Sequence, residues 1–218
     1  MMIIAQPKSA STSLLKTLAA MLNIKFQNGI SRNANYPKDC PGFSTLQKYH
    51  GTMVERDEGF FRYWLEKKDV IYKEHILPTE KHLLLLEKIG KPFLVLLRNP
   101  EHSFDNYVRL RQAYIDGKIS QRSNSILHAE RFVNFDMDGL RHDLISFYQC
   151  WKNARLSRLP YALYLDYEDL VLRYQETMQK ICDFLSVKCA IIPLVRAMGN
   201  RDLYCTYTGV GERRLKGC

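Results

Sequence analysis

Five consecutive apolar residues, Phe93–Leu97, constrain the fold of this chain more than any other segment. The run has no alternation of apolar and polar positions, which is typical of a strand buried on both faces of a parallel sheet. Because neighbouring parallel strands need crossover connections, usually helices, we expect helices on both faces of that sheet. The segment therefore predicts an α/β fold, provided that strands and helices alternate along the chain.

The rest of the sequence has this alternation. Short apolar runs predict further strands at residues 3–6, 69–73 and 161–165. Helical spacing of apolar residues predicts helices at residues 14–22, 78–90, 102–116, 140–155 and 170–185. Residues 28–51, rich in Asn, Pro, Gly and Ser, predict a long irregular loop. We therefore predict one α/β domain over residues 1–218, with a central parallel sheet flanked by helices.

Charge and cysteine content narrow the class of protein. The chain has 32 Lys and Arg against 23 Asp and Glu, a formal net charge of +9, so we expect an anionic partner. The sequence has neither a signal-peptide pattern nor an apolar run of about eighteen residues. Its six cysteines include no Cys-x-x-Cys pair, which disfavours a zinc site and a disulfide framework. We expect a cytoplasmic protein that binds neither a membrane nor a metal.

The turn after the first predicted strand is a candidate anion site. Residues 6–13 read Gln-Pro-Lys-Ser-Ala-Ser-Thr-Ser and lead into a helix, whose first N–H groups favour a phosphate or sulfate. The turn has none of the glycines of Gly-x-x-x-x-Gly-Lys-Ser/Thr, and its Lys8 comes early, which disfavours an enzyme that hydrolyses ATP or GTP. An ordinary helix cap is the alternative interpretation.

A second candidate anion site follows the buried strand. Arg98 comes directly after it, and Asn106 lies eight residues further on, in the next predicted helix. An Arg at the carboxyl end of a strand can bind a phosphate through two N–H donors, and an Asn can add a third. In the alternative interpretation, Arg98 caps a helix or pairs with Glu101 or Asp105.

Together these segments resemble the motifs of the sulfotransferases. Residues 7–12, Pro-Lys-Ser-Ala-Ser-Thr, resemble the 5′-phosphosulfate loop Pro-Lys-Ser-Gly-Thr-Thr, and Arg98 to Asn106 resembles the 3′-phosphate segment. Residues 72–78, Tyr-Lys-Glu-His-Ile-Leu-Pro, are similar to the Lys-Thr-His-Leu-Pro segment of the cytosolic small-molecule branch. Residues 164–170, Tyr-Leu-Asp-Tyr-Glu-Asp-Leu, resemble the family's Arg-Tyr-Glu-Asp-Leu.

The resemblance implies a fold, a co-substrate and roles for residues. The fold is the P-loop-like sulfotransferase fold, and the co-substrate is 3′-phosphoadenosine 5′-phosphosulfate (PAPS), used without a metal. His75 is implied as the general base, with Lys8 and Lys73 stabilising charge on the transferring group. The implied nucleotide contacts are Lys8, Ser9, Ala10, Ser11, Thr12, Ser13, Arg98, Asn106, Arg213 and Arg214.

Departures from the family pattern keep a second function open. Ala10 replaces the loop glycine, Asn106 replaces a Ser, and Ser13 with Leu14 replaces a Trp position. The leading interpretation is sulfuryl transfer to a hydroxyl or amine of a small-molecule acceptor. The alternative is a protein of the same fold that binds a nucleotide or a glycan without turnover. A nucleic-acid-binding domain is disfavoured, because the chain lacks a helix-turn-helix, a zinc finger and an aromatic RNA-binding motif.

Two further expectations concern the acceptor. Residues 28–51 and 120–134 are expected to shape its pocket, but the sequence identifies neither the acceptor nor the oligomeric state. The aromatic residues between 60 and 64 are expected in the core, or alternatively in the wall of the acceptor pocket.

Overall fold

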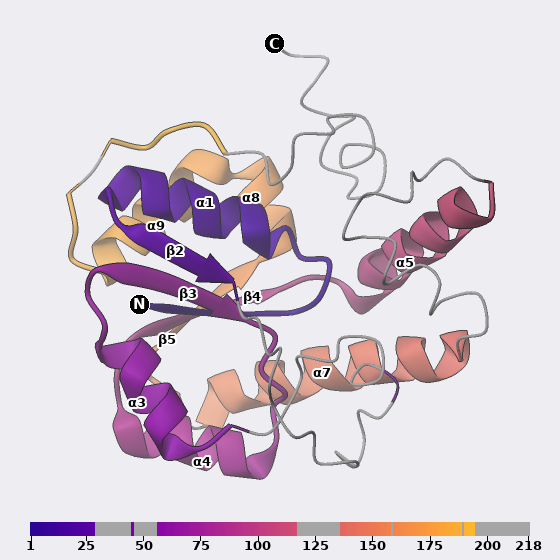
Figure 1. Ribbon diagram of the computed structural model, residues 1–218, viewed down its shortest axis with the longest axis horizontal. Helices are drawn as coiled ribbons and strands as arrows, with labels where there is room; N and C mark the ends of the chain where they lie inside the picture. The colour runs from indigo at the N-terminus through magenta and orange to yellow at the C-terminus, as the bar shows by residue number, and fades with distance from the viewer. Residues whose placement is uncertain (29–44, 46–55, 117–135, 158, 189, 195–218) are drawn as a thin grey trace.

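Five parallel strands form the sheet that the apolar runs predict (Figure 1). The computed structural model describes residues 1–28, 45, 56–116, 136–157, 159–188 and 190–194. The strands are β1 (Met2–Ala5), β2 (Lys25–Asn28), β3 (Val70–Glu74), β4 (Phe93–Leu97) and β5 (Ala162–Asp166). Their order is β2-β3-β1-β4-β5, and every pair of neighbours is parallel. The predicted α/β fold with a parallel sheet is confirmed.

Helices cover both faces of this sheet (Figure 1). One face carries α1 (Ser11–Leu22), α8 (Tyr167–Leu172) and α9 (Tyr174–Phe184). The other carries α3 (Glu58–Glu66), α4 (Glu80–Ile89), α5 (Pro100–Ile115) and α7 (Met137–Ser157). Because side chains alternate along a strand, Ile3 packs in the core under α1, and Met2 and Ile4 pack in the core on the opposite face. Each face thus has its own apolar core.

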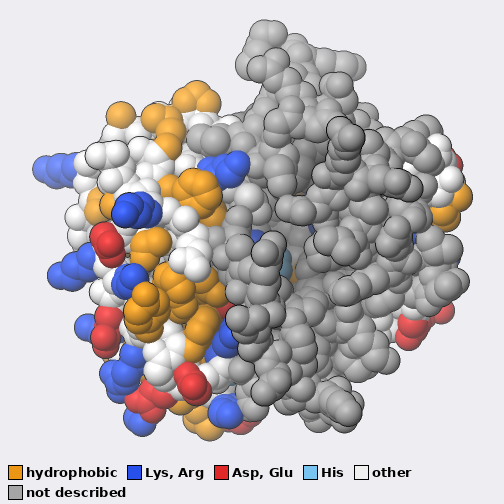
Figure 2. All heavy atoms as spheres, in the orientation of Figure 1, with side chains coloured by type: hydrophobic (Ala, Val, Ile, Leu, Met, Phe, Trp, Pro, Cys, Tyr) orange, Lys and Arg blue, Asp and Glu red, His pale blue; other side chains and the backbone are white. Residues whose placement is uncertain are grey.

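The cations on the described part of one face of the molecule are dispersed (Figure 2). On the described part of the face in Figure 2, Lys and Arg side chains stand apart from one another, among acidic and apolar side chains. A dispersed pattern of this kind is typical of an ordinary solvated surface. The described part of this face therefore shows no concentrated cluster of cations (Figure 2).

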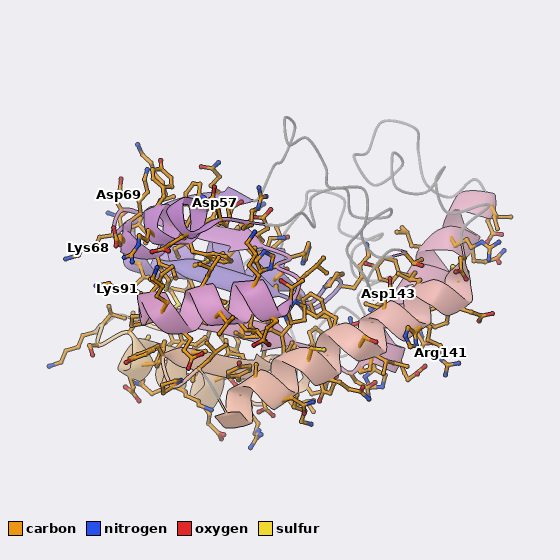
Figure 3. All side chains as sticks on the ribbon, turned by 90° about the horizontal axis from the view of Figure 1, so that it is seen from below. Asp57, Lys68, Asp69, Lys91, Arg141 and Asp143 are labelled. Atoms are coloured by element: carbon orange, nitrogen blue, oxygen red, sulfur yellow. The ribbon has the colours of Figure 1, made fainter. Side chains whose placement is uncertain are left out.

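Two elements were not predicted from the sequence, β2 and α3. β2 is an edge strand, and its one large apolar residue, Phe26, is 47% exposed, so the usual apolar run is missing. α3 has a recognisable helical signal. Asp57, which Figure 3 labels, caps this helix by accepting from the N–H of Phe60 at 2.8 Å. Phe61 and Trp64 are buried on one face of the helix.

The aromatic residues of α3 lie mainly in the core, as the first of the two interpretations expects. Phe61 is buried, and Trp64 stacks on Tyr72 of β3 with ring centroids 3.9 Å apart. Tyr63 is exposed, with its ring edge against Trp64. The helix is therefore fixed to the sheet by apolar and aromatic packing.

The predicted helix at residues 170–185 is two helices. α8 ends at Leu172 and α9 begins at Tyr174, because Arg173 between them leaves the helical region, with φ −124° and ψ 48°. By contrast, α4 stops where glycine predicts, since Gly90 has a φ of 60° and its N–H donates to the carbonyl of Leu86 at 3.1 Å.

Some predictions fall outside the described residues. The loop expected at residues 120–134 and the basic pair Arg213 and Arg214 lie outside them. So does the loop expected at residues 28–51, apart from residues 28 and 45. The single domain predicted over residues 1–218 likewise extends past the described ranges. Within those ranges, no helix combines the length and the apolar character that crossing a membrane requires.

The turn between β1 and α1 uses left-handed backbone at two positions. Lys8 has a φ of 63°, and Ala10, the N-cap residue of α1, has a φ of 59° and a ψ of 21°. An L-residue with a side chain pays a steric penalty in this region that glycine does not. The folded structure therefore holds Lys8 and Ala10 in a backbone conformation that residues with a side chain disfavour.

We predict that Ala10→Gly raises the free energy of unfolding by about 1 kcal/mol, because it removes this penalty. The matched control is Ala20→Gly, the same change at an exposed position inside α1. It should lower the free energy of unfolding by about 1 kcal/mol. Urea unfolding of both variants measures the two values. A loss of stability in both would contradict the strain assigned to Ala10.

Candidate functional site

The carboxyl ends of three neighbouring strands bring the predicted site residues together. β1 lies between β3 and β4, with Ile4 opposite Glu74 on one side and Ala5 opposite Leu96 on the other. Neighbouring strands lie about 4.8 Å apart. The turn after β1, the segment from Arg98 and the segment at His75 therefore meet at one edge of the sheet, where ligands bind in open parallel sheets.

The turn after β1 is held by its own hydrogen bonds. The buried hydroxyl of Ser9 donates to the carbonyl of Gln6 at 2.6 Å. The carbonyl of Ala10 accepts from the N–H groups of Ser13 at 3.0 Å and Leu14 at 3.2 Å. In this arrangement the Ser9 side chain shapes the turn, and the start of α1 points its positive end into the site.

Arg98 joins this turn to β4. Its side chain is 6% exposed, and its Nη1 donates to the carbonyl of Lys8 at 2.8 Å. Its guanidinium carbon lies 4.0 Å from the centre of the Tyr167 ring on α8. Glu101, one of its two expected partners in the alternative interpretation, pairs instead with Arg141 at 2.8 Å. The two predicted anion sites are thus in direct contact.

A pocket of about 240 Å³ opens beside Arg98 and Asn106. Its remaining lining residues are His102, Asp105, Arg109, Tyr167, Glu168, Val171 and Leu172. Within the described part of the chain, Nε of Arg98 and Nδ2 of Asn106 are buried without a hydrogen-bond partner. An unsatisfied buried donor costs about 1–3 kcal/mol, so a ligand that accepts from both nitrogens would be favoured here.

Two lysines bring buried positive charge to the same edge. Burial lowers the pKa of Lys8 to about 8. Burial also lowers the pKa of Lys73 to about 8; the nearby Glu74 raises this pKa and the nearby Lys8 lowers it further. An anion bound near these two lysines would stabilise their charged form.

His75 follows β3 and turns back towards β1. Its Nδ1 lies 2.7 Å from the carbonyl oxygen of Ala5. A carbonyl only accepts hydrogen bonds, so Nδ1 carries the proton, and the neutral ring has its lone pair on Nε2. The next residue is also held, because the carbonyl of Ile76 accepts from Nε1 of Trp151 at 3.2 Å. The ring therefore has the tautomer that a general base needs at Nε2.

Glu74, the carboxylate next to His75, is engaged on the opposite face of the sheet. It is 2% exposed, forms an ion pair with Arg56, and accepts from the hydroxyl of Tyr72 at 2.6 Å. Burial raises the pKa of Glu74, and the charge of Arg56 lowers it. Arg56 is held in turn by His82, whose Nε2 accepts from the Arg56 N–H at 2.8 Å. These contacts leave His75 better placed than Glu74 to meet a substrate.

The structure thus gathers Lys8, Lys73, His75, Arg98 and Asn106 around one edge of the sheet. Two further residues, Gln6 and Arg56, support this group. The sequence places Gln6 at the start of the predicted turn but gives its side chain no role, and it does not single out Arg56. Both have their roles through partners far along the chain.

Comparisons with known proteins bear on the fold. No protein-family model and no curated protein matches the chain. A solved sulfotransferase from Alicyclobacillus acidocaldarius is 13% identical in sequence, with a TM-score of 0.52 over 99% of this chain and 93% of that one. Mouse sulfotransferase SULT7A1, complexed with PAP, is also 13% identical, with a TM-score of 0.50 over 100% of this chain and 66% of its own. The structural overlap indicates a shared fold, and a sequence identity this low does not establish a shared activity.

The buried lysines predict a pH dependence of anion binding. An ammonium group is charged below its pKa, so the affinity for an anion should be full well below pH 8 and should fall as the pH rises through 8. Sulfate stays a dianion throughout, so a change in its affinity comes from the protein. We expect the affinity for sulfate, measured by calorimetry, to fall about tenfold between pH 7 and pH 9.5.

Lys8→Arg is the matched variant for this titration, because arginine keeps its charge over the whole range. Its sulfate affinity should fall less steeply than that of the wild type. An affinity that stays constant up to pH 10, where an ordinary lysine titrates, would contradict the lowered pKa values.

Proposed function

We propose that this chain, which has the sulfotransferase fold, transfers the sulfuryl group of PAPS to a hydroxyl or amine of a small-molecule acceptor. The observation that carries the proposal is the contact between two anion-binding segments, the Lys8 turn and the Arg98–Asn106 pair, beside a base of the right tautomer. PAPS has anionic groups at both its 5′ and its 3′ position. Neither a nucleic acid nor a membrane is part of the proposal.

The residues fit such a nucleotide. In the proposed complex, the start of α1 and the hydroxyls of Ser11 and Thr12 hold the 5′-phosphate. The unsatisfied nitrogens of Arg98 and Asn106 hold the 3′-phosphate, since both are buried donors at a pocket that needs an acceptor. Arg213 and Arg214 are proposed to complete this site.

The bound nucleotide supplies the sulfuryl group and leaves as the 3′,5′-bisphosphate. Nε2 of His75 takes the proton of the acceptor as the acceptor oxygen or nitrogen bonds to sulfur. The bond between sulfur and the bridging oxygen breaks, and Lys8 stabilises the charge that develops on that oxygen. Lys73 stabilises the oxygens of the transferring group. Such catalysis consists of positioning and charge stabilisation.

The test of the proposal is turnover. The purified protein is incubated with PAPS carrying a radiolabelled sulfuryl group and with a panel of phenols, alcohols, sugars and amines. We expect labelled product from at least one acceptor class. Binding of the nucleotide without transfer to any acceptor would favour the alternative, a nucleotide- or glycan-binding protein of this fold.

His75→Ala tests the role of the base. We expect kcat to fall about 100- to 10,000-fold, the usual contribution of general-base catalysis, while the affinity for the 3′,5′-bisphosphate stays within about twofold. The control is His142→Ala, at an exposed position of α7, which should leave both values unchanged. Single-turnover kinetics and calorimetry measure the two quantities. Full activity of His75→Ala would remove this residue from the mechanism.

A further inference from the structure

Gln6 is a polar residue at the centre of the site that no motif singles out. It follows β1 directly and its side chain is 0% exposed. Its N–H donates to the carbonyl of Leu96 at 2.9 Å, and its carbonyl accepts from the hydroxyl of Ser9 at 2.6 Å. Buried amide side chains are costly unless their polar atoms are paired, so the partners of this side chain are informative.

The side chain of Gln6 reaches into the second candidate anion site, the segment from Arg98 to Asn106. Its Oε1 accepts from the backbone N–H of Arg98 at 3.2 Å, and its Nε2 donates to the hydroxyl of Ser103 at 3.1 Å. Ser103 is fully buried on α5, three residues before Asn106, about one helical turn away. The side-chain amide of Gln6 therefore holds both the backbone of Arg98 and the helix that carries Asn106.

A second bridge runs in the opposite direction. Nη1 of Arg98 donates to the carbonyl of Lys8, two residues after Gln6. This bridge depends on the guanidinium itself, which a ligand competes for. The Gln6 bridge holds the Arg98 backbone, so it persists when the guanidinium turns to an anion.

We propose that Gln6 is a positioning residue that fixes the distance between the two anion subsites, and thereby selects ligands with two anionic groups over ligands with one. The inference rests on the proposed function, because it takes both segments to bind one nucleotide. When one anion of a ligand is bound, the second binds at an effective concentration set by geometry. Loss of the Gln6 hydrogen bonds loosens the spacing of the two subsites, and it reduces the affinity that a ligand gains from its second anionic group.

The test compares adenosine 3′,5′-bisphosphate with adenosine 5′-monophosphate by calorimetry, in the wild type and in Gln6→Met. Methionine has a similar size and cannot form the two bridging hydrogen bonds. We expect the wild type to prefer the bisphosphate, and Gln6→Met to reduce that preference about five- to tenfold while its affinity for the monophosphate stays within about twofold.

Two further variants separate positioning from mere stability. Ser103→Ala removes one bridging bond and leaves Gln6 in place, so it serves if Gln6→Met does not fold, and it should reduce the preference in the same direction. Tyr174→Phe removes a partly buried hydrogen bond to the carbonyl of Ile192, away from the site, and should leave the preference unchanged. An equal loss of affinity for both nucleotides in Gln6→Met would overturn the positioning role.

The remaining outcomes distinguish this inference from the proposed function. If the wild type prefers the bisphosphate and both bridge variants keep that preference, the inference is wrong and the proposed function stands. If the wild type binds neither nucleotide, both are wrong.

Discussion

The pairing of β1 along both its edges is the interaction on which the rest of the structure depends. Ile3 pairs with Lys73 on one side and with Leu94 on the other, so the first strand in the chain lies at the centre of the sheet. This placement puts the turn after β1 between the segments that follow β3 and β4. The carbonyl of Ala5 then orients His75, and the next residue, Gln6, anchors Arg98. The proposed base and the proposed anion-binding segment are thus both held from the end of one strand.

The electrostatics of the site follow from that crowding. Burial lowers the pKa of Lys8 and of Lys73, and Nε of Arg98 is buried without a hydrogen-bond partner. Glu74, which precedes His75 in the sequence, is paired with Arg56 on the other face of the sheet. A negative ligand at this site would favour the charged form of both lysines and would accept a hydrogen bond from Arg98. The donors of the protein need little rearrangement to receive it. Desolvation and preorganisation therefore favour the same kind of ligand.

The sequence predicted the parts of this fold that rest on local pattern. The apolar run of β4 and the glycine that ends α4 are properties of a few neighbouring residues. β2 escaped prediction because it has no apolar run, and its one large apolar residue, Phe26, is 47% exposed. Motifs identified Lys8, His75 and Arg98, but Gln6 has its role only through a partner 92 residues away. Such a contact exists in the folded sheet and has no local signature.

The same long separations have a consequence for folding. The hydrogen-bonded pair His75 and Ala5 is separated by 70 residues in the sequence, and the pair Arg98 and Lys8 by 90. The site is therefore built from contacts that close large loops. Contacts of this kind form late, after much chain entropy has been lost. A partly folded chain that has only its helices and local turns has no site at all. A ligand that binds here therefore recognises only the complete sheet. Its stabilisation of the native chain grows with the logarithm of the ligand concentration once that concentration exceeds the Kd.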